Sequence, residues 1–252
     1  MAKLKALAVV VLCHPLVGRL LRSLFGGRVP SLRFRGWRLD VRSPAVSPRT
    51  VAMIFWGVYE SAELRFVERG LRRDLDVVEC GSSLGGVSSA IAQRLEPGRR
   101  ILCVEANSDL VPLLERNVRS NAPDVESTVV NRAIDYERSE VSFIEGDTST
   151  GGRTSGESAG TRRTVAATTL SDLLDAHGLE EYALVSDIEG AEAGFIHHDA
   201  PALSRCQQIL IELHPGERYG NLETEAGMIE ALETRHGFRL TPKRGPVALI
   251  ER

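Results

Sequence analysis

The strongest constraint on the fold of this chain is a repeated alternation of short apolar runs with segments that have helical spacing. Apolar runs at residues 75–80, 101–105 and 127–131 predict strands, and helices are expected over 62–70, up to about 95, and over 110–120. This β-α-β-α-β order predicts a parallel sheet with helices on both faces. A chain of 252 residues can bury such a core as one domain without disulfides or metals.

The second half continues the alternation and ends differently. We expect further strands and helices at the following residues: strands 141–144, 163–167, 182–187 and 208–213, and helices 170–177 and 224–235. Two short strands at 238–241 and 247–251 are joined by a turn at 242–246, so they should pair antiparallel. The predicted fold class is α/β: a doubly wound, mostly parallel seven-stranded sheet with a C-terminal antiparallel hairpin.

Residues 1–50 differ in character from the rest. Two lysines precede the apolar run 6–13, but His14-Pro15 interrupts it well short of the roughly 20 residues that a spanning helix needs. The amphipathic stretch that follows fits packing on the protein, contact with a partner subunit, or peripheral contact with a membrane. Residues 26–50 are rich in Gly, Pro, Ser and Arg and predict a linker, so a domain is expected over 51–252.

The amino-acid composition excludes several functions. The net charge of −3, with acids and bases interspersed, argues against a nucleic-acid partner. Lysine occurs only at positions 3, 5 and 243, which excludes P-loop and Tyr-x-x-x-Lys chemistry within the domain. The four cysteines form no CxxC pair and indicate reduced core residues of a cytoplasmic protein. Residues 146–161 contain no large apolar side chain and predict a surface loop, either a lid or an inert insertion.

The first candidate site lies where the strand at 75–80 runs into glycines. Open α/β sheets bind nucleotides at such a strand end, beside the N-terminus of the next helix. Gly81 allows a sharp turn and a close backbone approach, and Gly85 completes a GxxxG spacing with it. Ser83, between the two glycines, is a further cofactor-binding candidate, as is each glycine. Glu79, at the strand end, is placed to engage the ammonium of a cofactor that carries an amino acid.

The next two strand ends extend this site. Glu105 lies about 20 residues beyond the glycines, where an acid can hold both ribose hydroxyls, and Ala106 follows it. Asn131 and Ala133, after the third strand, should lie beside an adenine, although Asn131 also fits a simple turn. This arrangement predicts an adenosine-type ligand and does not by itself define the reaction.

A group of polar residues then marks the ends of the two following strands. Asp187 is a candidate to orient the cofactor or accept a proton, and Glu189 is a candidate catalytic or substrate-binding acid. Glu192 is a further substrate-binding candidate, although it also fits a first-turn helix acid. Glu212 and His214 belong to the same sheet edge, Glu212 as a substrate ligand and His214 as a general base for an alcohol.

In this order the motifs resemble those of the FkbM-type S-adenosylmethionine-dependent methyltransferases. The resemblance spans residues 59–215 and rests on these segments: Glu79–Gly85, Glu105–Asn107, Asn131–Ala133, Thr169–Leu173, Asp187–Glu192 and Ile211–His214. It implies a class I, Rossmann-like domain and in-line methyl transfer to a hydroxyl of a sugar, glycan or secondary metabolite. It also implies that Tyr59-Glu60, before the first strand, helps to cover the cofactor. The chain departs from the family at Ser82-Ser83, where Ala-Asn is usual, and at Ser186, where lysine is frequent.

Two alternatives stay open at this point. A catalytically inactive scaffold that binds an adenosine cofactor stays open because of the departure at Ser186. An NAD-dependent oxidoreductase would share the architecture, but GxGxxG does not follow the first strand. The clustered carboxylates are compatible with Mg²⁺, although no metal-ligand set is evident from the sequence. The partners expected are a small-molecule or glycan acceptor and a second copy of the chain.

Overall fold

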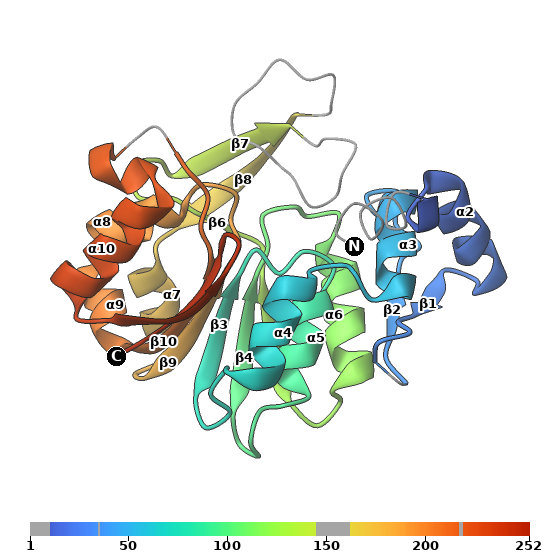
Figure 1. The fold of residues 1–252 in the computed structure, drawn as a ribbon, viewed down its shortest axis with the longest axis horizontal. Coiled ribbons are helices and arrows are strands. Elements are labelled where there is room, and N and C mark those ends of the chain that lie inside the picture. The colour runs from blue at the N-terminus through green and yellow to red at the C-terminus, as the bar shows by residue number, and fades with distance from the viewer. Residues whose placement is uncertain (1–10, 35, 145–161, 217–218) are drawn as a thin grey trace.

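The centre of the fold is a seven-stranded sheet with the order β11-β12-β10-β9-β3-β4-β5 (Figure 1). The structure is a computed structural model that describes residues 11–34, 36–144, 162–216 and 219–252. The strands of this sheet are β3 (Asp76–Cys80), β4 (Arg100–Val104), β5 (Glu126–Val130), β9 (Tyr182–Ser186), β10 (Cys206–Glu212), β11 (Arg239–Arg244) and β12 (Val247–Glu251). Of these seven, only β12 runs against its neighbours. The predicted mostly parallel sheet with a C-terminal antiparallel hairpin is therefore confirmed.

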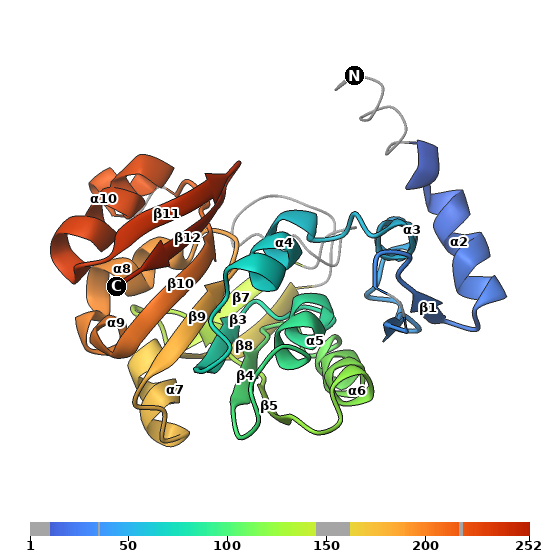
Figure 2. The same ribbon diagram turned by 60° about the horizontal axis from the view of Figure 1, so that its bottom comes forward.

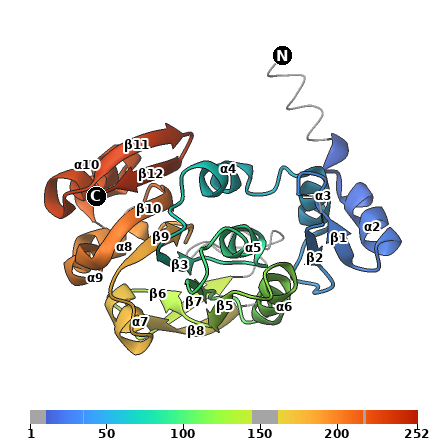
Figure 3. The same cartoon turned by 90° about the horizontal axis from the view of Figure 1, so that it is seen from below.

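Helices cover both faces of the sheet, as Figure 3 shows. Their bounds are α4 (Ser61–Arg69), α5 (Gly86–Ala92), α6 (Val111–Asn121), α7 (Leu170–Ala176), α8 (Glu192–His198), α9 (Ala200–Arg205) and α10 (Glu225–His236), with a short 3-10 helix η1 (Gly220–Glu223) before α10. Successive strand residues point to opposite faces, so Val77 joins the core beneath α4, α5 and α6, whereas Val78 joins the core beneath the other helices. The sheet thus separates two hydrophobic cores.

The order of the strands defines where a ligand is expected. From β3 the chain moves outward through β4 to β5, and it then returns to β9 on the other side of β3. The carboxyl ends of β3 and β9 therefore meet at a topological switch point. Gly81, directly after β3, has φ +86°, and a Cβ there would lie 1.8 Å from the carbonyl oxygen of Asp187. Only glycine fits at this contact between the two strand ends.

Two predicted strands belong to a separate small sheet. β6 (Ala133–Ile134), β7 (Glu140–Ile144) and β8 (Arg162–Thr168) form a three-stranded sheet with the order β6-β8-β7. The predicted strands at 141–144 and 163–167 correspond to β7 and β8, which pair antiparallel as a hairpin. The surface loop predicted over 146–161 lies outside the described residues.

The turn of the C-terminal hairpin is shorter than expected. The sequence predicts a turn over 242–246, but β11 continues through Pro242 to Arg244. β11 is the edge strand of the sheet, where a residue without an N–H group is tolerated. The pairing with β12 also shifts in register between Leu240 and Lys243, around this proline.

The stretch predicted as a linker contains regular structure. Before the main sheet the chain forms α2 (Pro15–Leu24), β1 (Arg28–Pro30), β2 (Arg38–Asp40) and α3 (Pro48–Trp56), with β1 and β2 paired antiparallel (Figure 2). Asp40 anchors this segment to α6, because its backbone N–H donates to Asn117 Oδ1 at 2.6 Å and its carboxylate pairs with Arg116 at 3.1 Å. Hydrogen bonds from Arg42 lower the pKa of Asp40 to about 2. These long-range contacts give order to a sequence whose composition resembles a linker.

Two further expectations concern burial and membrane spanning. All four cysteines are free and buried, as expected of core residues. Among the described residues, no helix is both long and apolar enough to cross a bilayer.

Candidate active site

A cavity lined by carboxylates opens at the carboxyl ends of β3, β9 and β10. Its lining residues are Glu60, Glu63, Glu79, Cys80, Gly81, Val87, Val185, Ser186, Asp187, Leu210 and Glu212. Five of these side chains are acids, and no basic side chain is found among the described lining residues. Like charges at short range repel one another, so this cavity favours a ligand with positively charged groups.

The acids converge because of strand alternation and helix packing. Glu79, Asp187 and Glu212 each follow a core residue by two positions, so they share the sheet face covered by α4. Glu63 lies on the buried side of α4, which covers this face, and is 6% exposed. The same geometry that builds the core therefore brings four acids from four elements together.

Burial and crowding disfavour the ionised forms of these acids. Burial raises the pKa of Glu79 to about 7, although a hydrogen bond from Ser88 opposes the shift. Burial and the charge of Glu212 raise the pKa of Asp187 to about 7. A hydrogen bond with Glu63, together with burial, raises the pKa of Glu212 to about 8. A bound cation would lower these pKa values, because it stabilises the charged forms.

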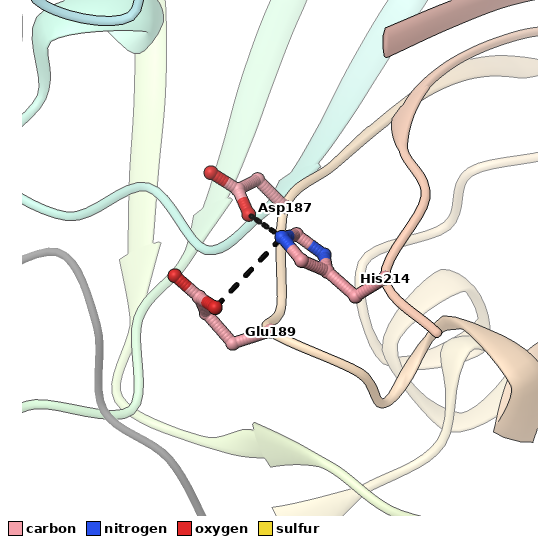
Figure 4. Close-up of side chains that lie close together, drawn as sticks. All are labelled: Asp187, Glu189 and His214. Carbon is pink, nitrogen blue, oxygen red and sulfur yellow. Dashed lines mark ion pairs between the residues drawn. The ribbon is translucent and has the colours of Figure 1, made fainter. Parts of the chain in front are cut away.

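His214 lies at the edge of this cluster with its two ring nitrogens in different surroundings (Figure 4). Nε2 is 3.8 Å from a carboxylate oxygen of Asp187, 3.8 Å from Glu189 and 3.7 Å from Glu212. Nδ1 is 3.2 Å from Glu192 Oε1, within hydrogen-bond distance. The three residues predicted as catalytic, Asp187, Glu189 and His214, therefore lie together.

The carboxylates around His214 favour its protonated form. Burial lowers the pKa of the imidazole, but the hydrogen bond and charge of Glu192 and the charges of Asp187 and Glu189 outweigh burial and raise it to about 9. His214 is therefore mainly protonated at neutral pH in the protein alone. A role as general base requires the neutral imidazole, so ligands that add positive charge nearby would promote it.

Glu192 occupies a different place from the one expected of a substrate-binding residue. Its side chain is fully buried, and its two oxygens accept hydrogen bonds from the backbone N–H groups of Ile188 and Gly190, each at 2.9 Å. Its first oxygen is also the partner of His214 Nδ1. Glu192 therefore positions the imidazole and the loop after β9. Glu189, in that loop, has φ +53°, a conformation that is uncommon for residues other than glycine.

Glu105 is held in place by backbone groups from two segments. Its carboxylate accepts hydrogen bonds from the N–H groups of Ser83 and Asn107, both at 2.7 Å, and the residue is 8% exposed. The Ser83 hydroxyl lies 3.3 Å from that of Tyr59. Tyr59, Ser83 and Glu105, all predicted to bind the cofactor, thus form one hydrogen-bonded group beside the glycine turn. The carboxylate is fixed before any ligand binds.

The residues predicted to bind the cofactor after β4 and β5 include two alanines in a small apolar cluster. Ala106 and Ala133 pack against the small cluster built by Val141 and Val165. The side-chain amide of Asn131 donates to the backbone carbonyls of Glu105 and Ala106, at 2.8 and 3.0 Å. Asn131 therefore braces the loop after β4, and its contact with adenine stays a prediction.

Gly85 has a packing role that the sequence did not reveal. It is the N-cap of α5 with φ +86°, and a Cβ there would lie 3.1 Å from a side-chain carbon of Leu114 in α6. Its absent side chain therefore allows the two helices to approach each other. Direct contact of Gly85 with a cofactor stays a prediction.

Glu63 was not predicted as a site residue, whereas Glu60 was expected, together with Tyr59, to help to cover the cofactor. Glu60 is the N-cap of α4 with φ +44°, and its carboxylate lies near Gly86, where a Cβ would be 3.4 Å from Glu60 Oε2. Glu63 precedes Phe66 and Val67 at helical spacing, so it is an acid on the apolar face of a helix. An acid on the apolar face of a predicted helix is the signal by which the sequence could have identified Glu63, because a buried acid requires a partner or a function.

The class of protein follows from the sheet, the switch-point cavity and a comparison with known families. The profile described as methyltransferase FkbM domain matches residues 79–240, which is more than half of the chain. The protein therefore belongs to the FkbM methyltransferase family. The family match implies the use of S-adenosylmethionine, as the sequence predicted. No curated protein matches the sequence.

Several solved structures match about three quarters of this chain at low sequence identity and with TM-scores below 0.5. A candidate rRNA methylase from Clostridium thermocellum is 10% identical with a TM-score of 0.45, covering 76% of this chain and 92% of that one. Precorrin-6y C5,15-methyltransferase from Geobacter metallireducens is 15% identical with a TM-score of 0.42, covering 77% and 86%. A candidate O-methyltransferase from Klebsiella pneumoniae is 11% identical with a TM-score of 0.45, covering 76% of each chain.

Proposed function

We propose that the protein transfers the methyl group of S-adenosylmethionine to a hydroxyl of a sugar, a glycan or a secondary metabolite. The observation that carries this proposal is the acidic lining of the cavity beside Gly81. S-adenosylmethionine carries an ammonium and a sulfonium, which suit such a lining. The pyrophosphate of a nicotinamide dinucleotide carries negative charge, which the same carboxylates repel. The charge of the cavity therefore favours methyl transfer over hydride transfer.

The described residues supply a matching set of contacts for this cofactor. Glu79 is placed for the ammonium, Glu105 for the ribose hydroxyls, and Ala106 and Ala133 for one face of adenine. Tyr59, buried beside the glycine turn, lies where it can cover the bound molecule. When bound, the cofactor supplies a methyl group on a positively charged sulfur that already reacts with nucleophiles. The protein then needs chiefly to position the acceptor and remove its proton.

His214 is the residue best placed to take the proton of the acceptor hydroxyl. Glu192 fixes the ring through Nδ1 and leaves Nε2 directed toward Asp187, Glu189 and Glu212. This resembles other general bases in which a buried carboxylate orients a histidine. The three carboxylates around Nε2 can accept hydrogen bonds, so they suit a substrate that has several hydroxyl groups to donate them. A sugar offers that arrangement.

A transfer assay with methyl-labelled S-adenosylmethionine tests this proposal. The protein is incubated with sugars, glycans and phenolic or aliphatic alcohols, and products are analysed by mass spectrometry for one added methyl group and its position. We expect the label on an oxygen atom. Label on nitrogen or carbon contradicts O-methylation, and cofactor binding without transfer to any acceptor favours the inactive scaffold.

Glu192→Gln is expected to change the pH dependence of turnover as well as its rate. His214 acts as a base when neutral, so kcat/KM should rise with pH through the pKa of about 9. Removing the Glu192 charge lowers the pKa of His214, so the rise of kcat/KM should move to lower pH. The plateau value of kcat/KM at high pH should fall about tenfold, because the imidazole ring is less well oriented. Exposed Glu180, in Glu180→Gln, is the control. An unshifted profile in Glu192→Gln contradicts the assignment of His214 as base.

The sequence is compatible with Mg²⁺, and we propose a site for it among the carboxylates. Glu63, Asp187 and Glu212 bring three carboxylate oxygens within 4.8 Å of one another, and Mg²⁺ prefers oxygen ligands. Asp187, Glu189 and His214 form a second such group, but a protonated imidazole has no lone pair for a metal. We expect that EDTA treatment followed by desalting lowers turnover at least tenfold, and that added Mg²⁺ restores it. If EDTA treatment leaves turnover unchanged, no metal is required, and these carboxylates then contact only the cofactor and the methyl acceptor.

A further inference from the structure

Helix α2 packs one face closely against α3, and within the part of the chain that the structure describes its opposite face is exposed. A Cβ at Gly18 would lie 1.6 Å from the carbonyl oxygen of Pro48, so the two helices touch there through their backbones. The outer face presents leucines at a spacing of four residues: Leu16, Leu20 and Leu24, which are 64%, 60% and 68% exposed. Single exposed leucines are ordinary, whereas an aligned row of them marks a binding surface.

Charge is segregated along the chain, and the expectation of interspersed charge was wrong. Ten basic residues and one acid, Asp40, precede Glu60, whereas the rest of the chain has 21 basic and 33 acidic residues. The Asp40 carboxylate is itself buried and paired with Arg42 and Arg116. Arg19 and Arg28, at and just beyond α2, are exposed. The N-terminal segment therefore presents positive charge beside the leucine row.

The same segment contributes to a basic cavity against α6. This cavity has a volume of about 290 Å³ and is lined by Arg28, Asp40, Arg42, Arg116, Arg119 and Ser120. Four arginines against one carboxylate leave the lining positively charged. Arginine recognises phosphate groups readily, because its planar guanidinium donates several hydrogen bonds. The cavity thus offers a second basic site, between the N-terminal segment and α6, that suits phosphate groups.

We propose that α2 and the basic residues around it dock on an anionic phospholipid bilayer. The leucines would enter the boundary between headgroups and acyl chains, and the arginines would contact headgroup phosphates. A nucleic acid as the partner would pair its phosphates with the arginines but would leave the leucines exposed to water. A second copy of the chain as the partner would cover the leucines with its own leucines, but it would bring two basic segments together, which repel each other. Helix α2 lies at the end of the molecule opposite α10 in all three views, so docking leaves the sheet undisturbed (Figures 1, 2 and 3).

Sedimentation of the full chain with vesicles tests this proposal. Vesicles of phosphatidylcholine mixed with phosphatidylglycerol are compared with vesicles of phosphatidylcholine alone. We expect binding to the mixed vesicles to be at least about tenfold tighter. The triple variant Leu16→Ser, Leu20→Ser, Leu24→Ser should bind at least about tenfold more weakly. The double variant Arg19→Glu, Arg28→Glu should lose a similar factor, and high salt should weaken binding by the parent.

Matched controls separate this surface from general charge and from the cofactor site. Arg235→Glu, Arg239→Glu makes the same change of charge at the α10 end and should bind as the parent does. All variants should bind S-adenosylmethionine equally, so failure of the docking proposal is distinguishable from failure of the proposed function. Equal vesicle binding by the leucine variant would falsify the proposal. The proposal would also be wrong if the parent did not bind vesicles but formed a dimer that the leucine variant could not form. Binding of the parent to RNA, without binding to vesicles, would contradict it as well.

Discussion

Glu105→Ala is expected to lower the affinity for S-adenosylmethionine about 100-fold. In the proposed complex the Glu105 carboxylate accepts hydrogen bonds from both ribose hydroxyls, and hydrogen bonds to a charged group contribute roughly 1.5 kcal/mol each or more. Losing two of them corresponds to about 3 kcal/mol, or about two orders of magnitude in the dissociation constant. Isothermal titration calorimetry of the parent and the variant measures this difference.

The control must separate binding from folding, because Glu105 also accepts hydrogen bonds from Ser83 and Asn107. Alanine leaves these two buried N–H groups without a partner, which also destabilises the fold. Glu105→Gln keeps the size of the side chain and one carbonyl acceptor, so an intermediate loss of about tenfold is expected for it. Thermal unfolding of both variants identifies any loss of folded protein. Glu105→Ala binding the cofactor as tightly as the parent overturns the ribose assignment.

His214→Ala is expected to lower kcat by about 100-fold or more, because general base catalysis commonly contributes this much. The affinity for S-adenosylmethionine should change little, since His214 lies among the carboxylates assigned to the acceptor and not beside Glu105. Steady-state kinetics with a substrate found in the transfer assay, combined with calorimetry, separates the two quantities. The expected result is a loss of turnover with the cofactor still bound.

His177 provides a matched control for this variant. It follows α7 as the C-terminal cap and is not part of the carboxylate cluster. His177→Ala should therefore turn over as the parent does. If His214→Ala retains full activity, then His214 is not the base, and Asp187 becomes the remaining candidate at the same strand edge.

The elements of the main sheet were predictable because the signal for each lies within a few neighbouring residues. Val77 and Val78 belong to an apolar run that ends at Glu79, and the glycine that follows has to turn between two strand ends. The positions of Glu79, Asp187 and Glu212 followed in turn, because the carboxyl ends of parallel strands meet at one edge. The strands of the sheet and its polar edge were therefore accessible before the structure, whereas the order of the strands was not.

Contacts between residues distant in sequence were less accessible. The burial of Glu192 depends on two backbone N–H groups and on His214, which is 22 residues away. The place of Glu63 depends on how α4 lies against β10. The strands β1 and β2 are three residues each, and they are held by Asp40 through contacts with a distant helix. Local pattern cannot specify interactions of this kind.

In the proposed function, the acid-lined cavity beside Gly81 belongs to a binding site for S-adenosylmethionine. Calorimetric titration of the purified full chain with S-adenosylmethionine and, separately, with NADH tests it most directly, with a second series in the presence of Mg²⁺. We predict a dissociation constant in the micromolar range for S-adenosylmethionine and no detectable binding of NADH. Binding of NADH, or of neither molecule, contradicts the claim.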